Sequence, residues 1–145
     1  MVRKKKGRIL IIEDDGLMVE LMCAVLTDLG YQVASAHKVE AALIDFERLR
    51  YDLVIMDLFM DGMGGIEGIA EIGSLNKDIP IIATSAGYKD MPPEKALFAA
   101  RKIGATAALP KPFTPEELGR MVTEVLGGKA AGSKIRSWRP QDYSR

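Results

Sequence analysis

Short apolar runs alternate with amphipathic segments along most of the chain, and this alternation restricts the possible folds more than any other feature. The first run, residues 9–12, is apolar throughout and stops at acidic residues, as expected of a strand buried on both faces of a parallel sheet. When strands alternate with helices over short connections, few chain topologies are possible, because the connection between two parallel strands is right-handed. The pattern predicts an α/β, doubly wound fold, with a five-stranded parallel sheet and helices on both faces.

The alternation occurs five times and predicts bounds for each strand. The expected strands are residues 9–12, 32–36, 53–56, 79–83 and 106–109. Apolar residues at helical spacing mark one face of each of five helices, and these marker residues fall within 17–29, 39–49, 66–75, 97–103 and 118–125. The apolar face of the first helix is predicted to comprise Leu17, Leu21, Val25 and Leu29, with Met18, Met22 and Leu26 beside it.

The last helix has the clearest start signal. Thr114 can accept a hydrogen bond from a free backbone amide, Pro115 suits the first helical position, and Glu117 completes a capping box. We expect the pair Gly127 and Gly128 to end this helix.

Charged side chains are unevenly distributed, although the net charge of the 145 residues is zero. Residues 1–8 carry five basic side chains, and residues 127–145 carry five more with a single acid, which leaves a net charge of −9 on residues 9–126. We expect a basic N-terminal arm at 1–8, one folded domain at 9–126 and a basic, flexible tail at 127–145. Such ends are commonly solvated, or they dock on acidic surfaces or phosphates.

Length and cysteine content exclude a disulfide scaffold. A chain of this length buries a core without covalent help, and Cys23 stands in an apolar run, where it fits as a small core residue. No apolar stretch approaches the roughly 18 residues of a spanning helix, and the run after the basic start is too short for a signal peptide. We expect a cytoplasmic protein that is not inserted in a membrane.

Acidic, hydroxyl and ammonium groups follow the predicted strands, at the edge where an open α/β sheet binds its ligands. In chain order they are Glu13, Asp14, Asp15, Asp57, Thr84, Ser85 and Lys111. Close carboxylates repel one another unless a cation lies among them, and oxygen ligands favour a hard ion such as Mg²⁺. Lysine and hydroxyl groups can donate to phosphoryl oxygens, so the set indicates phosphoryl transfer to a carboxylate. Asp15 can instead cap the helix that it precedes.

Over about residues 8–126 the sequence resembles the receiver domain of two-component response regulators. The matching motifs are ILIIEDD at 9–15, VIMDL at 54–58 followed by GMGG at 62–65, PIIATSA at 80–86 and KPF at 111–113. Each motif is weak alone, but their order and their place at strand ends make the set specific. The resemblance, which is to stand-alone receivers of the chemotaxis type, implies a flavodoxin-like sheet with strand order 2-1-3-4-5.

The resemblance implies that Asp57 accepts a phosphoryl group from a histidine kinase or a phosphotransfer protein. Asp14, Asp57 and the backbone carbonyl of Phe59 would bind Mg²⁺ directly. Glu13 would act on the ion through a water. The protein would then be a signalling module that switches protein partners and catalyses only its own phosphorylation and dephosphorylation.

The same resemblance assigns two further residues. Ser85, counted from Pro80, fills the position of the switch hydroxyl, whereas Thr84 falls where the family usually has an apolar residue. Lys111 would contact the phosphoryl group, and its peptide bond to Pro112 is expected to be cis.

Three positions depart from the family pattern. Ala108 stands where an aromatic switch residue is frequent, so the fourth helix and its preceding loop, or Tyr88 or Phe98, would report phosphorylation instead. The segment 85–111 is a few residues longer than usual, which suggests a specialised partner surface. Asp61 replaces a frequent proline and adds negative charge, either near the metal site or as a solvated loop residue.

Two other function classes stay open at this point. A Mg²⁺-dependent phosphatase that forms an aspartyl-phosphate usually needs a second acid two residues after the nucleophile, where this chain has Phe59. A nucleic-acid-binding regulator would use the basic ends, but neither shows a recognition helix, so binding would be weak and salt-dependent. Trp138 in the tail could stack on a base or a partner, although a lone tail tryptophan more often packs back on the domain.

Overall fold

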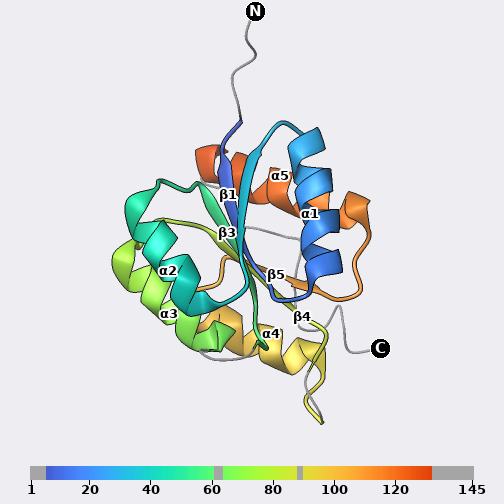
Figure 1. Cartoon of the computed structure of the whole chain (residues 1–145). Coiled ribbons are helices and arrows are strands. Elements are labelled where there is room, and N and C mark those ends of the chain that lie inside the picture. The colour runs from blue at the N-terminus through green and yellow to red at the C-terminus, as the bar shows by residue number, and fades with distance from the viewer. Residues whose placement is uncertain (1–5, 61–63, 88–89, 132–145) are drawn as a thin grey trace, which may run out of the picture.

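The computed structural model describes residues 6–60, 64–87 and 90–131, which form five strands and five helices in strict alternation. The strands are β1 (Arg8–Ile12), β2 (Gln32–Ala36), β3 (Leu53–Asp57), β4 (Ile81–Ser85) and β5 (Ala107–Pro110). The helices are α1 (Gly16–Asp28), α2 (Val39–Arg48), α3 (Gly65–Leu75), α4 (Pro93–Lys102) and α5 (Pro115–Ala131). Neighbouring strands are parallel in the order β2-β1-β3-β4-β5 (Figure 1), which confirms the predicted fold class and strand order. Within these described ranges, no helix combines the length and the apolarity needed to cross a lipid bilayer.

Two hydrophobic clusters lie on opposite faces of the sheet, because successive side chains of a strand point to opposite sides. Along β1, Ile9 and Ile11 belong to the cluster under α1 and α5. Leu10 and Ile12 belong to the cluster under α2, α3 and α4. All four side chains are buried, as predicted for a strand covered on both faces, and Figure 1 shows the two helical layers.

The buried face of α1 differs from the prediction. Val19, Met22 and Leu26 are buried, whereas Leu17 is 78% exposed and Leu21 is 40% exposed. Apolar residues surround most of this helix, so spacing alone does not determine which stripe faces the sheet. Cys23 is partly buried beside the α1–α5 cluster, in agreement with its interpretation as a small residue at the core.

Several element boundaries also differ from the prediction. β4 covers Ile81–Ser85, so the two hydroxyl residues that were expected after the strand belong to it, and β5 covers Ala107–Pro110. α5 does not end at Gly127 and Gly128 but continues to Ala131. A glycine costs a helix only about 1 kcal/mol, and the residues that follow this pair are good helix formers.

The start of α5 confirms the predicted capping box. The Thr114 hydroxyl accepts a hydrogen bond from the Glu117 amide at 3.0 Å, and the Glu117 carboxylate accepts one from the Thr114 amide at 2.8 Å. Of the basic ends, residues 1–5 and 132–145 lie outside the described residues. The proposed division into arm, domain and tail therefore stays a prediction.

The start of α3 packs directly against the end of β3. A Cβ atom on Gly65 would lie 2.5 Å from the Asp57 carbonyl oxygen and 2.5 Å from the Leu58 Cα. The Gly65 amide donates a hydrogen bond to the Leu58 carbonyl at 3.0 Å. Only glycine fits this contact, which sets the position of the backbone around Asp57.

We expect Gly65→Ala to lower the free energy of unfolding by about 1–3 kcal/mol, the usual cost of overpacking a close contact. Gly73→Ala, in the same helix, is the matched control, because a Cβ at Gly73 would meet nothing within 4 Å. That change should raise the stability by up to about 1 kcal/mol through helix propensity. Urea unfolding of both variants measures the difference, and equal effects would contradict the close contact at Gly65.

Candidate functional site

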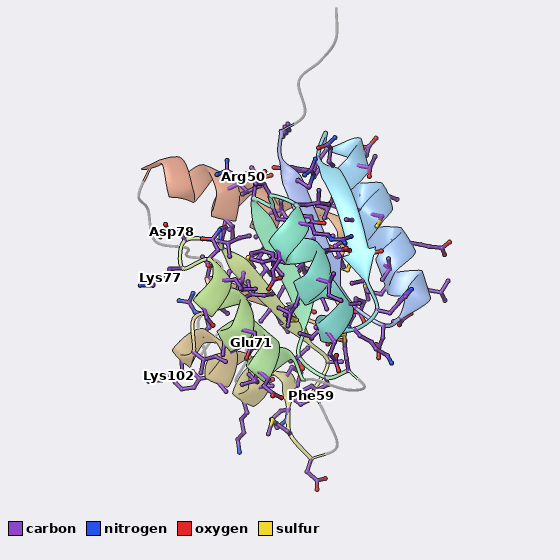
Figure 2. All side chains as sticks on the ribbon, turned by 60° about the vertical axis from the view of Figure 1, so that its left-hand side comes forward. Arg50, Phe59, Glu71, Lys77, Asp78 and Lys102 are labelled. Carbon is purple, nitrogen blue, oxygen red and sulfur yellow. The ribbon has the colours of Figure 1, made fainter. Side chains whose placement is uncertain are left out.

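Acidic side chains from two adjacent strands meet at the carboxyl edge of the sheet. Because β1 pairs with β3, Glu13 and Asp14 come next to Asp57, the last residue of β3. One carboxylate oxygen from each of the three residues lies within 4.8 Å of the other two. Glu13 and Asp57 are buried, whereas Asp14 is exposed. Phe59, labelled in Figure 2, lies two residues beyond β3 at the same edge.

Lys111 brings a positive charge to this acidic group from the end of β5. Its Nζ lies 2.7 Å from Glu13 Oε1 and 3.5 Å from Asp57 Oδ2. The Lys111 backbone amide donates a hydrogen bond to the Ser85 carbonyl at 2.8 Å, which ties the residue to β4. The peptide bond between Lys111 and Pro112 is cis, as predicted.

Backbone amides hold the carboxylates in place. The Asp15 amide donates to Glu13 Oε2 at 3.2 Å, and the Phe59 amide donates to Asp57 Oδ1 at 3.3 Å. The Asp15 side chain accepts hydrogen bonds from the amides of Leu17 and Met18. Asp15 therefore caps α1, and the carboxylates available to a ligand are those of Glu13, Asp14 and Asp57.

The electrostatics of the site follow from burial and from the crowding of charges. Burial raises the pKa of the Asp57 carboxyl to about 7; the nearby Lys111 charge lowers this pKa and the Glu13 charge raises it. Burial acts to lower the pKa of Lys111, but the hydrogen bond to Glu13 and the charge of Asp57 outweigh burial and raise it. The ammonium therefore stays charged, and Asp57 is poised to exchange its proton near neutral pH.

Ser85 is fully buried at the end of β4. Its strand neighbour Thr84 is the Cα partner of Asp57, so Ser85 lies one residue nearer the carboxyl edge. The Ser85 hydroxyl accepts a hydrogen bond from the Gly87 amide at 2.9 Å. Gly87 has a φ of +92°, and a Cβ there would lie 2.7 Å from the Met91 carbonyl oxygen, so the turn after β4 needs glycine.

The positions tied to the departures from the family pattern lie in different surroundings. Ala108 is fully buried within β5, in the cluster under α2, α3 and α4. Phe98 is 43% exposed on α4, and the Lys102 ammonium lies 5.2 Å from the centre of its ring. Asp61 and Tyr88 lie outside the described residues.

The structure brings together most of the residues that the sequence singled out. Glu13, Asp14, Asp57 and Lys111 form one cluster, and Ser85 is linked to Lys111 through the backbone. The sequence reasoning assigned no role to Gly65 or Gly87. The available signals were the GMGG motif at 62–65, which ends at Gly65, and the position of Gly87 two residues after Ser85.

We expect the Asp57 carboxyl of the metal-free protein to titrate near pH 7, compared with an ordinary value of 3.8. The unfolded chain releases this proton at lower pH than the folded chain, so this group makes the fold less stable as pH rises from about 4 to 7. ¹³C NMR of the carboxyl carbon measures the midpoint. Lys111→Met should move the midpoint upward, because the favourable charge is lost, whereas Lys77→Met should leave it unchanged. A midpoint near 4, or a downward shift in Lys111→Met, would contradict this account.

Comparisons with known sequences agree with the site. Residues 9–123 match the family model of the response regulator receiver domain. The chemotaxis protein CheY of Thermotoga maritima is 32% identical over 119 residues, which cover 81% of this chain and 96% of CheY. The phosphate regulon transcriptional regulatory protein PhoB of Escherichia coli is 29% identical over 121 residues, or 82% of this chain. The aligned part is 51% of PhoB, so the chain spans about half the length of that relative.

Comparison with solved structures also finds similarity to a chemotaxis protein. The chemotaxis protein CheY4 of Vibrio cholerae matches with a TM-score of 0.74 and 28% sequence identity, over 83% of this chain and 98% of that one. The family match covers the five strands, apart from Arg8 at the start of β1, and every residue of the acidic cluster. The chain therefore belongs to the family of response regulator receiver domains.

Proposed function

We propose that Asp57 is the phosphoacceptor of this receiver domain and that its phosphorylation switches the protein partners of the chain. The observation that carries the proposal is the position of Asp57, a buried carboxylate at the end of a central strand, 3.5 Å from the Lys111 ammonium. Membership of the receiver family makes a histidine kinase or a phosphotransfer protein the proposed donor. A cytoplasmic location and a protein target downstream belong to the same proposal.

The proposed reaction moves a phosphoryl group from a phosphohistidine to Asp57. A carboxylate oxygen of Asp57 forms the new bond to phosphorus while the bond between phosphorus and the donor imidazole nitrogen breaks. The electron pair of that bond leaves with the imidazole, which then takes up a proton. Asp57 must be ionised to attack, which its pKa of about 7 permits around neutral pH.

The acidic cluster fits a hard divalent cation such as Mg²⁺. Its donors are carboxylate oxygens within 4.8 Å of one another, and burial together with the Glu13 charge raises the pKa of Asp57 despite the nearby Lys111 ammonium. Asp14, Asp57 and the Phe59 carbonyl would hold the ion directly, with Glu13 acting through water. The ion would neutralise negative charge on the phosphoryl oxygens.

Lys111 and Ser85 complete the proposed site. The Lys111 ammonium, already held between Glu13 and Asp57, can donate hydrogen bonds to an incoming phosphoryl oxygen. The Ser85 hydroxyl would release the Gly87 amide and turn toward the phosphoryl group, which changes the turn that leads to α4. Because Ala108 has no aromatic ring, this turn and α4 would carry the signal.

The rival functions have less support. A phosphatase of the aspartyl-phosphate type usually needs a second acid two residues after the nucleophile, where this chain has Phe59. The role of the protein is therefore proposed as signalling, with catalysis limited to its own phosphorylation and dephosphorylation. Nucleic-acid binding through the basic ends would involve residues 1–5 and 132–145, outside the described ranges.

We expect acetyl phosphate with Mg²⁺ to add one phosphoryl group to the full chain and none to Asp57→Asn. The change removes the nucleophilic oxygen and keeps the size of the side chain, so the fold is preserved. Asp78→Asn, a change of the same kind at an exposed residue (Figure 2), should be labelled like the natural chain. Intact-protein mass spectrometry counts the groups, and stoichiometric labelling of Asp57→Asn would refute the assignment.

A further inference from the structure

We propose that the C-terminal segment, residues 132–145, folds back onto the domain and binds in the groove between α1 and α5, with Trp138 as its anchor. This inference goes beyond the phosphorylation site, because the groove lies on the face of the sheet covered by α1 and α5. Three observations support it: the shape of the groove, its charge, and the place where α5 ends.

The groove is an apolar depression between two helices. It has a volume of about 530 Å³, and its walls include Val25 of α1, the C-cap residue Leu29 that follows α1, and Gly119 of α5. A Cβ at Gly119 would lie 3.1 Å from the Leu29 side chain, so the missing side chain brings the two helices close together. A hollow of this kind fits a flat, largely apolar side chain such as an indole, which buries a large area with few rotatable bonds.

The rim of the groove carries a net negative charge. Asp28, Glu116 and Glu124 line it together with a single base, Arg120. The segment 132–145 has four basic side chains and one acidic side chain. Lys134, Arg136 and Arg139 flank the apolar residues Ile135 and Trp138, so an apolar anchor with basic neighbours faces an apolar groove with an acidic rim.

The end of α5 places this segment within reach. From Ala131 back to Gly119 the distance along the helix is about 18 Å, at 1.5 Å per residue. The seven residues 132–138 span about 23 Å when extended, so Trp138 reaches the groove. Gly132 and Ser133 come next in the sequence after Ala131 and are residue types that favour a reversal of the chain.

A second copy of the chain is a less suitable occupant. A two-fold contact brings the same surface of both copies together, so the acidic rim of one groove would approach the acidic rim of the other. The basic segment 132–145 would instead attract the acidic rim. Because this segment is attached to α5, its effective concentration at the groove is high.

The experiment uses the intrinsic fluorescence of the full chain, in which Trp138 is the only tryptophan. We expect the native chain to emit at a shorter wavelength than the chain in denaturant, with a several-fold lower acrylamide quenching constant. The double variant Asp28→Lys, Glu124→Lys reverses the rim charge and should move both readings toward those of the denatured chain. The control Glu47→Lys, Glu71→Lys makes the same change in charge on α2 and α3 and should behave like the natural chain.

Three outcomes would overturn the proposal. In the first, the emission of the native chain matches that of the denatured chain. In the second, Trp138 stays protected from acrylamide after the rim charge is reversed. In the third, the protection is lost when dilution dissociates a dimer, which would assign the groove to a second copy. A second measurement does not depend on the charge variants. The backbone amide signals of Leu29, Gly119 and Thr123 should shift in the ¹⁵N NMR spectrum of Trp138→Ala, and unchanged signals there would equally overturn it.

Discussion

Crowding of carboxylates at one edge of the sheet is the constraint on which the rest of this structure depends. Glu13, Asp14 and Asp57 bring oxygen atoms within 4.8 Å of one another, and two of these side chains are buried. Burial and repulsion both disfavour the ionised form of Asp57, and the Lys111 ammonium compensates for only part of this cost. Such an arrangement reduces the stability of the domain, and a cation and a phosphoryl group are the ligands that it is suited to receive.

The fold produces this crowding through its strand order. Placing β1 beside β3 puts two acidic strand ends next to each other, and placing β5 beside β4 brings Lys111 and Ser85 into backbone contact. The close approach of α3 at Gly65 then fixes the turn after Asp57. Residues separated by up to 98 positions, as Glu13 and Lys111 are, therefore meet because of sheet topology alone.

The parts of this picture that depend on periodicity and strand ends were predictable from the sequence. Alternation predicted the sheet, and polar residues after apolar runs predicted the cluster, because parallel strands end at a common edge. The buried stripe of α1 was not predictable, since Leu17 and Val19 are equally apolar and only packing on the sheet distinguishes them. The extension of α5 past Gly127 was also not predictable, because the small helix cost of two glycines is balanced against the helix propensity of the residues that follow. The Ser85 to Gly87 hydrogen bond depends on a backbone conformation that residue types alone do not specify.

The proposal that the buried Asp57 carboxyl holds a proton which a divalent cation displaces is tested most directly by the stabilisation that Mg²⁺ gives at different pH values. Below about pH 7 a proton on Asp57 competes with the ion, so the affinity for Mg²⁺ should fall by up to about tenfold for each pH unit. Thermal unfolding of the full chain at a fixed Mg²⁺ concentration should show a clear rise in Tm at pH 8 and little or none at pH 5. An equal rise at both pH values would contradict the account.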